Sequence, residues 1–541
     1  MVRARPGNST SIMGSGTPTN STTPTTNGLC VCAVPENDGF PFSFASVCAA
    51  YEACRKGKRN SRSAIEFELR REENLFLLWE ELRGGTWRPS PSFCFVTKRP
   101  KHREIFAAPF RDRVVHHLVV STLEPIWDPG FIYDSWACRK GKGTHGAVYR
   151  LQSFLRSVSG NGSQEAWFLH VDIRSYFVRI DKSILLARLM DRVRSRRPGL
   201  ERSMEWLLGV LVGADPTVNS IRKGDRGLFA RVPPHKSLFH TGNLTGLPIG
   251  NYTSQFFANV YLDALDQHAK HTLRIPRYIR YVDDIVMAST DPKELLDWEE
   301  SLGRFLSEEL KLEWNHRARR MAPVAAGCDF LGYTVWRNGL QPRRRTVGNC
   351  RERLEAAGKR LISQEKHWVS FGWPGNEVGA LRSILASYEG QFRHCTASAK
   401  VWRKIWNSFP WLTIYFEARA SGAGTLRFRF KDAVPKHFRS LREQYSWFAR
   451  RYSRYLLFFR IGSFYEFFGA NRETCLRYVE LQAGRGRKGL GPGVGLFHTS
   501  GLARKPEKLG KLMPVVIVES EPNVAGNVAL RRVSRIILPR R

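Results

Sequence analysis

Two adjacent aspartates lie inside an otherwise apolar stretch of the sequence, RYIRYVDDIVMAST, residues 277–290. Burying neighbouring carboxylates costs on the order of several kcal/mol unless a cation or hydrogen-bond donors compensate them. Mg²⁺ suits this role because it takes oxygen ligands and usually shares carboxylates with the phosphates of a substrate. Asp283 and Asp284 are therefore candidate metal ligands.

A two-metal site for phosphoryl transfer needs carboxylates from at least two chain segments. A third carboxylate is thus expected at the end of another strand, and Asp172 lies at the end of WFLHVDI, residues 167–173. A lone aspartate is more often a cap or a turn residue. The pair in an apolar hairpin, together with a strand-end partner, favours metal binding.

Hydrophobic periodicity predicts the elements that would hold these carboxylates. Residues 277–290 divide into RYIRY, VDD and IVMAS, which predicts a β-hairpin with the aspartates at its turn. The other predicted elements are a strand over 167–173, helices over 64–84, from about Arg111, over 182–213 with a break at Pro198, from about Ser254 to about Lys270 and over 292–311, strands around DFLGYTVW (329–336), and a mostly helical, basic segment over 343–415.

The composition indicates a polyanionic partner. The chain has 541 residues, with 85 Lys and Arg against 49 Asp and Glu, a net charge of +36 that exceeds what solubility needs. Nucleic acid is the commonest partner for such an excess, and a membrane surface is the other option. Because the sequence has no apolar stretch of about 18 residues and no signal-peptide pattern, we expect a cytoplasmic protein without a membrane partner.

Four of the ten cysteines cluster in the sequence, at Cys30, Cys32, Cys48 and Cys54. A zinc site is one interpretation of this cluster, although the spacing matches no common CxxC pair. Thiols in a reducing compartment are the alternative.

Three motifs, in family order, resemble those of reverse transcriptases. YVDD (281–284) resembles the metal-binding box, VDIRSYF (171–177) the first carboxylate motif, and DFLGY (329–333) the hairpin that grips the primer. The resemblance implies an α+β, right-hand polymerase fold of fingers, palm and thumb. It also implies an RNA-directed DNA polymerase, a nucleotidyltransferase that binds two Mg²⁺ ions, an RNA template, a DNA or cDNA primer and dNTPs.

The resemblance also implies roles for individual residues. Asp172, Asp283 and Asp284 would be the catalytic metal ligands, with Ile173 assigned to the same metal site. Phe177 would pack against the nucleotide sugar and exclude a ribose 2′-hydroxyl by its bulk.

A basic segment, KRPKHREIF (98–106), resembles the part of the fingers that holds the incoming triphosphate. Neutralising the charge of a transferring phosphate is the physical need. Arg103 fits this role best by position, and Lys98 or Lys101 would help. A solvated basic loop is the alternative for the two lysines.

The family usually has a lysine near LKLEWNHRARRM, residues 310–321, that protonates the leaving pyrophosphate. The candidates here are Arg317, Arg319 and Arg320. Arginine is a poor proton donor because its pKa exceeds about 12. This role is therefore unassigned.

The segment GLPIGNYTSQ (246–255) resembles the IGxxxSQ box of enzymes from diversity-generating retroelements. Gly250 would permit a close backbone approach to the nucleotide. Ile249 replaces the polar amide of other reverse transcriptases, which fits a polymerase that misreads, and Gln255 completes the box. The resemblance implies misincorporation opposite template adenine, a template-repeat RNA and a basic accessory oligomer.

Other classes of protein remain open at this point. A reverse transcriptase of a group II intron, a retron or a defence system is the alternative among enzymes. A catalytically silent nucleic-acid-binding protein is the alternative outside enzymes, and the three intact aspartates argue against it.

The segment LLFFRIGSFYEFFGAN (456–471) resembles the first domain of MutS mismatch-repair proteins. That family wedges a phenylalanine beside a mismatched base and bonds it with a glutamate, here Phe464 and Glu466. Ser463 and Asn471 depart from the family pattern. The chain contains no G-x-x-x-x-G-K-[ST] motif, so any mismatch recognition would be uncoupled from ATP.

A nearby GxGxxG match, residues 484–489, lacks the strand–helix context of a dinucleotide site. Its basic residues, Arg485, Arg487 and Lys488, are instead expected to contact phosphates.

These features predict a linear order of domains. The predicted ranges are a disordered tail (1–28), fingers and palm (29–335), a helical basic thumb (336–415), a connector (416–450) and a small α/β domain like MutS domain I that binds nucleic acid (451–541).

Overall fold

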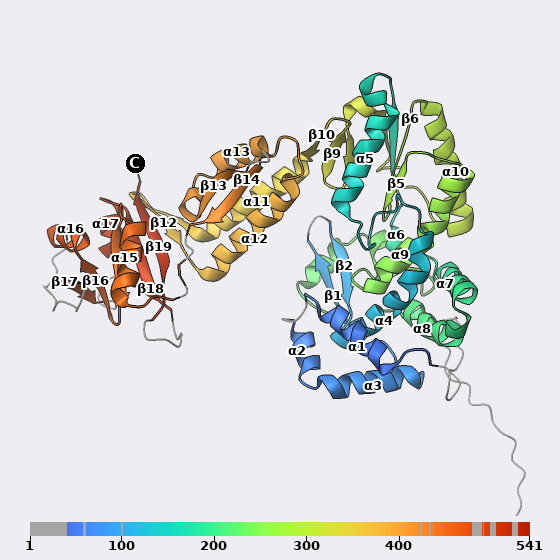
Figure 1. The fold of residues 1–541 in the computed structure, drawn as a ribbon, viewed down its shortest axis with the longest axis horizontal. Coiled ribbons are helices and arrows are strands. Elements are labelled where there is room, and N and C mark those ends of the chain that lie inside the picture. Colours follow the sequence, from blue (N-terminus) through green and yellow to red (C-terminus); the bar gives the residue numbers. More distant parts are fainter. Residues whose placement is uncertain are drawn as a thin grey trace, which may run out of the picture. The chain divides into compact units, whose positions relative to one another are not determined.

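The computed structural model describes residues 40–57, 61–98, 101–421, 425–431, 434–435, 437–478, 490, 492–497, 505–521 and 529–540. The chain divides into two compact units, residues 1–323 and 324–541 (Figure 1). Each unit combines helices with sheets, which confirms the α+β class. The predicted tail, Cys30 and Cys32 lie outside the described residues, so the zinc interpretation stays a prediction.

The first unit surrounds two sheets with helices. Its helices are α1 (Phe44–Arg55), α2 (Arg62–Glu68), α3 (Arg71–Arg83), α4 (Phe110–Trp127), α5 (Thr144–Val158), α6 (Tyr176–Arg179), α7 (Lys182–Arg196), α8 (Glu201–Gly213), α9 (Tyr252–Gln267) and α10 (Pro292–Leu310). One sheet has the order β2 (Arg103–Ala107), β1 (Ser92–Thr97), β4 (Ser220–Arg222), and the other has the order β5 (Tyr278–Tyr281), β6 (Asp284–Ser289), β3 (Trp167–Asp172), β7 (Arg320–Pro323).

The four-stranded sheet carries the predicted carboxylates. Its central strands β3 and β6 are antiparallel, and Asp172 lies opposite Asp284. Leu169 and Val171 of β3 belong to the main core of the unit. Because side chains alternate along a strand, Asp172 points to the other face. The predicted hairpin over 277–290 is confirmed as β5 and β6.

Several predicted helices are confirmed, and their ends follow from local chemistry. The break at Pro198 separates α7 from α8. The helix α10 begins at Pro292, where the missing N–H of proline costs nothing, and the Asp291 side chain accepts a bond from the Lys293 N–H at 2.8 Å.

The single helix predicted over residues 64–84 is wrong. Helix α2 ends at Glu68 and α3 begins at Arg71, because Arg70 leaves the helical region (φ −130°, ψ 52°). The Asn74 side chain donates to the Phe67 carbonyl at 2.9 Å, which stabilises the turn. No Gly or Pro marks this break, so periodicity alone extended the helix through it.

The described residues of the second unit form three sheets. Its helices are α11 (Arg344–Leu361), α12 (Gly375–Phe392), α13 (Ser398–Ser408), α14 (Leu412–Tyr415), α15 (Leu441–Arg451), α16 (Ala470–Tyr478) and α17 (Lys505–Gly510). Strands β10 (Gly339–Pro342), β9 (Tyr333–Trp336) and β8 (Cys328–Phe330) form one sheet, β13 (Phe416–Ser421) and β14 (Thr425–Phe430) a second, and β11 (Ile362–Gln364), β12 (Trp368–Gly372), β19 (Arg531–Pro539), β18 (Val515–Ser520), β15 (Leu456–Ile461), β16 (Phe464–Phe468) and β17 (Gly493–Phe497) the third, in that order.

A β-hairpin interrupts the segment that was predicted to be mostly helical. Strands β11 and β12 lie between α11 and α12, and β12 pairs with β19 near the end of the chain. One core cluster joins Leu354 and Leu381 of these helices to Val516 and Ile536 of the large sheet. The predicted boundaries at 415 and 450 therefore fall within a single packed unit.

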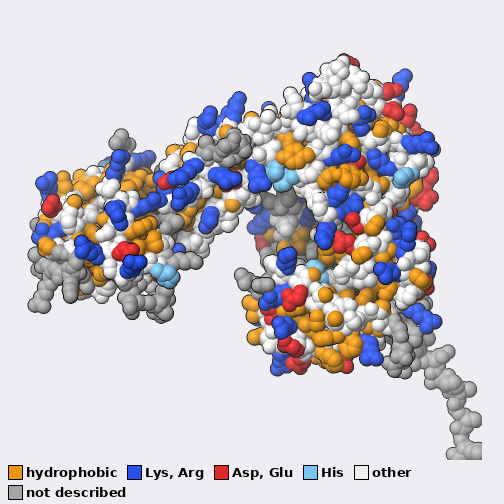
Figure 2. All heavy atoms as spheres, in the orientation of Figure 1, with side chains coloured by type: hydrophobic (Ala, Val, Ile, Leu, Met, Phe, Trp, Pro, Cys, Tyr) orange, Lys and Arg blue, Asp and Glu red, His pale blue; other side chains and the backbone are white. Residues whose placement is uncertain are grey.

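No helix in the described part of the chain is both long enough and apolar enough to cross a membrane. Lys and Arg side chains are visible across both units in Figure 2, in keeping with the net charge of +36.

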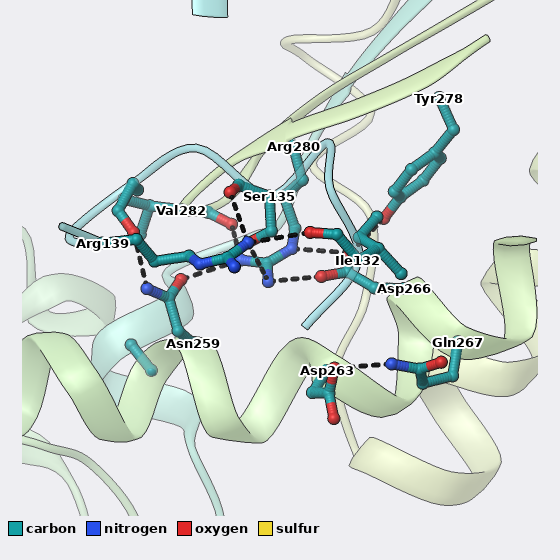
Figure 3. A network of polar contacts seen from close by, with 12 residues as sticks. Ile132, Ser135, Arg139, Asn259, Asp263, Asp266, Gln267, Tyr278, Arg280 and Val282 are labelled. Carbon is teal, nitrogen blue, oxygen red and sulfur yellow. Dashed lines mark hydrogen bonds and ion pairs between the residues drawn. The ribbon is translucent and has the colours of Figure 1, made fainter. Parts of the chain in front are cut away.

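A buried arginine joins the hairpin that carries the aspartates to helix α9 (Figure 3). Arg280 of β5 and Asp266 of α9 are both fully buried and form a bidentate pair, with Nε–Oδ1 at 2.7 Å and Nη2–Oδ2 at 2.5 Å. Arg280 Nη1 also donates to Asn259 Oδ1 at 3.2 Å, and Nη2 donates to Ser135 Oγ at 3.1 Å. Arg280 thus holds β5, α9 and the loop around Ser135 together.

The same guanidinium stabilises the turn between β5 and β6. Arg280 Nη1 donates to the Val282 carbonyl at 3.1 Å. Val282 has φ +57°, a left-handed conformation that costs a β-branched residue about 1–3 kcal/mol. The buried pair therefore helps to fix the conformation of the residue that directly precedes Asp283.

We predict that Arg280→Met lowers the free energy of unfolding of the first unit by about 3–5 kcal/mol, because Asp266 is left buried and unpaired. The double variant Arg280→Met/Asp266→Leu should recover most of this loss, since it removes both buried charges. Urea denaturation followed by circular dichroism measures both. Arg304→Met removes an exposed ion pair with Glu300 and should cost less than about 1 kcal/mol. A double variant as unstable as the single one would contradict the prediction.

Candidate active site

The structure brings the three predicted carboxylates together at one end of the four-stranded sheet. Asp172 and Asp284 are paired across β3 and β6, and Asp283 lies in the turn between β5 and β6. Ile173 follows β3; it is buried, and its N–H donates to the Asp283 carbonyl at 3.3 Å. Two separate chain segments therefore supply the carboxylates, as a two-metal site requires.

The electrostatics of the three carboxylates favour a cation. Burial raises the pKa of Asp283 above its usual value, and the carboxylates of Asp172 and Asp284 raise it further, whereas Arg103 opposes them. Burial also raises the pKa of Asp172, against a hydrogen bond from Asn315. The carboxylates thus repel one another, and a divalent cation would relieve this repulsion.

The donor set fits Mg²⁺ that is shared with a substrate. Carboxylate oxygens are the ligands that Mg²⁺ prefers, and it usually takes one or two of them together with substrate phosphates and water. In the described ranges, no group of three or more His, Cys, Asp or Glu side chains is placed to hold a metal ion by itself.

Two residues that the sequence did not single out hold the carboxylates in place. Asn315 donates from Nδ2 to Asp172 Oδ2 at 2.8 Å and from its backbone N–H to the Asp172 carbonyl at 2.7 Å. His170 Nε2 lies 3.3 Å from Asp284 Oδ1. Strand alternation could have indicated His170, which precedes Asp172 by two residues. No sequence signal could have indicated Asn315.

The predicted triphosphate residues lie on the hairpin of β1 and β2. Arg103 is the first residue of β2, and its charge opposes the rise in the pKa of Asp283. Lys101 precedes the strand, and its charge opposes the rise in the pKa of Asp172. All three predicted cations, including Lys98 directly after β1, are exposed.

The IGxxxSQ box packs against the same hairpin. The Phe106 N–H donates to the Ile249 carbonyl at 2.8 Å. Gly250 has φ +128°, and a Cβ there would lie 2.6 Å from the Phe106 carbonyl oxygen. In the protein alone, the close approach that requires glycine is therefore made by β2. Ile249 is half-buried.

Phe177 and Gln255 border the same region. Phe177 is half-buried, and its carbonyl accepts from the Leu247 N–H at 2.8 Å. Gln255 is exposed on α9, and its Oε1 lies 3.6 Å from the Cys138 thiol. The structure thus gathers the predicted nucleotide-binding residues of three distant segments around β2 and the start of α9.

The predicted proton donors have no such arrangement. Arg319 pairs with Glu299 through two bonds of 2.7 and 2.8 Å. Arg320 lies over the Phe168 ring, and Arg317 is exposed. The role of proton donor stays unassigned.

The predicted mismatch-reading residues lie in the second unit. Phe464 and Glu466 are half-buried and share one face of β16, whereas Tyr465 and Phe467 are buried on the other face in a separate core cluster. The basic residues of the predicted phosphate loop, Arg485, Arg487 and Lys488, lie outside the described residues.

Ser463 and Asn471, the two residues that depart from the MutS pattern, lie close to this motif in the sequence. Asn471 accepts from the Leu457 N–H at 3.3 Å and donates to the Tyr445 hydroxyl at 3.2 Å, so it holds α16 to its neighbours. Ser463 is exposed in the turn between β15 and β16.

Two protein families match parts of this chain. Residues 96–335 match the family described as reverse transcriptase (RNA-dependent DNA polymerase). Residues 439–502 match MutS domain I, a match that begins just before α15.

Individual proteins are similar at low identity. The chain is 21% identical over 321 residues to Protein YkfC of Escherichia coli (strain K12), covering 58% of this chain and 70% of that protein. It is 22% identical over 305 residues to the group II intron-encoded protein LtrA of Lactococcus lactis subsp. cremoris, covering 49% of this chain and 50% of LtrA. The chain therefore spans about half the length of LtrA.

A solved structure of telomerase from Candida albicans with a TWJ fragment of telomeric RNA is similar at 12% identity and a TM-score of 0.33, covering 60% of this chain and 55% of that one. The match over residues 96–335 includes all three carboxylates, Arg103 and the IGxxxSQ box. Residues 96–335, which hold the candidate active site, therefore match a reverse transcriptase domain.

Proposed function

We propose that this chain is an RNA-directed DNA polymerase whose active site is the cluster of Asp172, Asp283 and Asp284. The observation that carries the proposal is the convergence of these carboxylates, from two paired strands of a reverse transcriptase domain, opposite the cations Lys101 and Arg103. The substrates would be an RNA template, a DNA or cDNA primer and dNTPs.

Each part of the site has a distinct task in this proposal. Two Mg²⁺ ions, held by the three carboxylates beside Ile173, would supply charge stabilisation to the transferring phosphate. Arg103 and Lys101 bind the triphosphate, because fixed cations compensate its charge. Phe177 lies beside the sugar and excludes a 2′-hydroxyl.

We further propose that the enzyme belongs to a diversity-generating retroelement, which would supply a template-repeat RNA and a basic accessory oligomer. The IGxxxSQ box supports this subtype, because the side chain of Ile249 offers no hydrogen bond beside the base pair. A group II intron enzyme is the second candidate, and the similarity to LtrA favours it. The two candidates differ in where copying errors fall.

The C-terminal sheet is proposed to bind DNA duplexes and to prefer mismatched ones. The match to MutS domain I and the shared face of Phe464 and Glu466 on β16 support this role. A wedged aromatic ring unstacks a base step at a cost of a few kcal/mol, and a mismatched step has already lost part of its stacking energy.

Asp283→Ala should abolish Mg²⁺-dependent primer extension on an RNA template, because the site loses one of its metal ligands. The matched control is Asp297→Ala, which removes an exposed carboxylate from α10 and should extend at the wild-type rate. Extension by a correctly folded Asp283→Ala variant would contradict the assignment. Thermal unfolding of both variants checks their folding.

Errors of the wild-type enzyme should concentrate opposite template adenine, and Ile249→Gln should make copying more faithful by restoring a hydrogen-bonding side chain. Ile249→Val keeps the apolar character and should keep the error pattern. Sequencing of extension products measures both. Errors spread evenly over the four template bases would exclude the retroelement subtype and favour the group II intron candidate.

In the full-length protein, Phe464→Ala should remove a preference for mismatched over matched duplexes while leaving the salt dependence of binding unchanged, since general charge sets that dependence. The full chain is needed because β12 pairs with β19 of the same sheet. Tyr478→Ala, an exposed aromatic of α16, is the control. Competition binding at two salt concentrations measures the preference, and equal wild-type affinity for both duplexes would refute it.

A further inference from the structure

A basic segment between α8 and the IGxxxSQ box packs onto the hairpin that carries Arg103. The segment contains β4 and three short 3-10 helices, η4 (Arg226–Arg231), η5 (Pro234–Lys236) and η6 (Leu238–His240). Strand β4 lies parallel to β1, and the Lys223 N–H donates to the Cys94 carbonyl at 2.7 Å. The segment is therefore an ordered extension of this sheet.

Apolar contacts fix the segment further. Leu238 shares a buried cluster with Cys94 and Phe106 of the hairpin, while Leu228 and Val232 share another with Val96. Such burial contributes on the order of 1.5–3 kcal/mol for each large side chain. The position of η5, between these anchors, is thus well defined.

The buried carboxylate of Glu104 joins this segment to the strand that begins with Arg103. Glu104, the residue after Arg103, accepts from Ser237 Oγ at 2.6 Å and from the Leu238 N–H at 2.9 Å. Only 5% of its surface is exposed, so these bonds replace water for both of its oxygens. Lys236 directly precedes Ser237 and is therefore held close to Arg103.

The charges around Lys236 are those of the active site. Lys236 is exposed. Partial desolvation of its side chain lowers its pKa, the cations Lys101 and Arg103 lower it further, and Asp172 opposes them. The charge of Lys101 in turn lowers the pKa of Asp172, and that of Arg103 lowers the pKa of Asp283. Three cations from two segments therefore lie together beside the carboxylates and repel one another. A multivalent anion between them would relieve this repulsion.

We propose that Lys236 is a third binding residue for the triphosphate of the incoming nucleotide and for the pyrophosphate that leaves. This inference rests on the proposed polymerase function, and it assigns a role to a segment in which no site residue was predicted. A triphosphate is the fitting ligand because its several negative charges match three cations beside a carboxylate site. Contact with the backbone of a nucleic acid is the competing role.

The test compares Lys236→Gln with Lys236→Arg in the full-length protein. Primer extension on RNA should show that Lys236→Gln raises the KM for dNTP about tenfold, a change that corresponds to one lost charge-assisted contact, and changes kcat less than about twofold. The inhibition constant of pyrophosphate should rise in parallel. Lys236→Arg keeps the charge and should stay within about twofold of wild type.

Arg231→Gln removes an exposed charge from the same segment and is the matched control, with KM and kcat as in wild type. Calorimetric binding of inorganic tripolyphosphate with Mg²⁺ gives a second readout without catalysis, and Lys236→Gln should weaken it by a similar factor. Thermal unfolding confirms that the variants are folded.

An unchanged KM and unchanged tripolyphosphate binding in Lys236→Gln would overturn the inference. So would a weaker affinity for primer–template with a smaller salt slope and an unchanged KM, which would identify a backbone contact. A wild-type protein that fails to extend any primer would instead refute the polymerase function, while tripolyphosphate binding would still decide the role of Lys236.

Discussion

Mutual repulsion among Asp172, Asp283 and Asp284 is the constraint around which the first unit is organised. Placing three carboxylates where two strands meet destabilises the folded chain, since burial and like charge both disfavour it. The cluster persists because surrounding elements over-determine its geometry. Asn315 bonds Asp172 through both side chain and backbone, and Arg280 fixes the turn that presents Asp283. The unfavourable electrostatic interactions are thus confined to the carboxylate cluster, whereas the residues that stabilise its geometry come from several segments.

Helix α9 lies between the IGxxxSQ box and the turn that carries the aspartates. Gln255, Asn259 and Asp266 are separated by four and seven residues, so they lie along one face of the helix. Gln255 meets Cys138, Asn259 donates to the Ala137 carbonyl and accepts from Arg280, and Asp266 pairs with Arg280. One helical face therefore connects the IGxxxSQ box to the turn with the aspartates. We expect a change in the packing of α9 to affect both places, because most residues between Gln255 and Asp266 are buried.

The sequence predicted the elements whose signal is local. The apolar run of β6 with its flanking turn, the strand end at Asp172 and the helix start at Pro292 each follow from a few neighbouring residues, and all three are found. Features that depend on distant partners were missed. The hairpin of β11 and β12 exists because β19, about 165 residues later, offers an edge to pair with. The proximity of Lys236 to Arg103 depends on the hydrogen bonds that Glu104 accepts from Ser237 and Leu238. No local pattern in that segment could indicate which strand it would join.

The pairing of β12 with β19 changes how the C-terminal region must be understood. A region that resembles a separate MutS module would be expected to fold around its own sheet and to connect through a flexible linker. Instead, the helices α11 and α12 and the large sheet share one core, in which Leu354 and Leu381 contact the same cluster as Val516 and Ile536. Phe464 and Glu466 therefore lie on a sheet that shares its core with these helices. A duplex bound at β16, as proposed, would therefore lie on a sheet whose core includes side chains of α11 and α12.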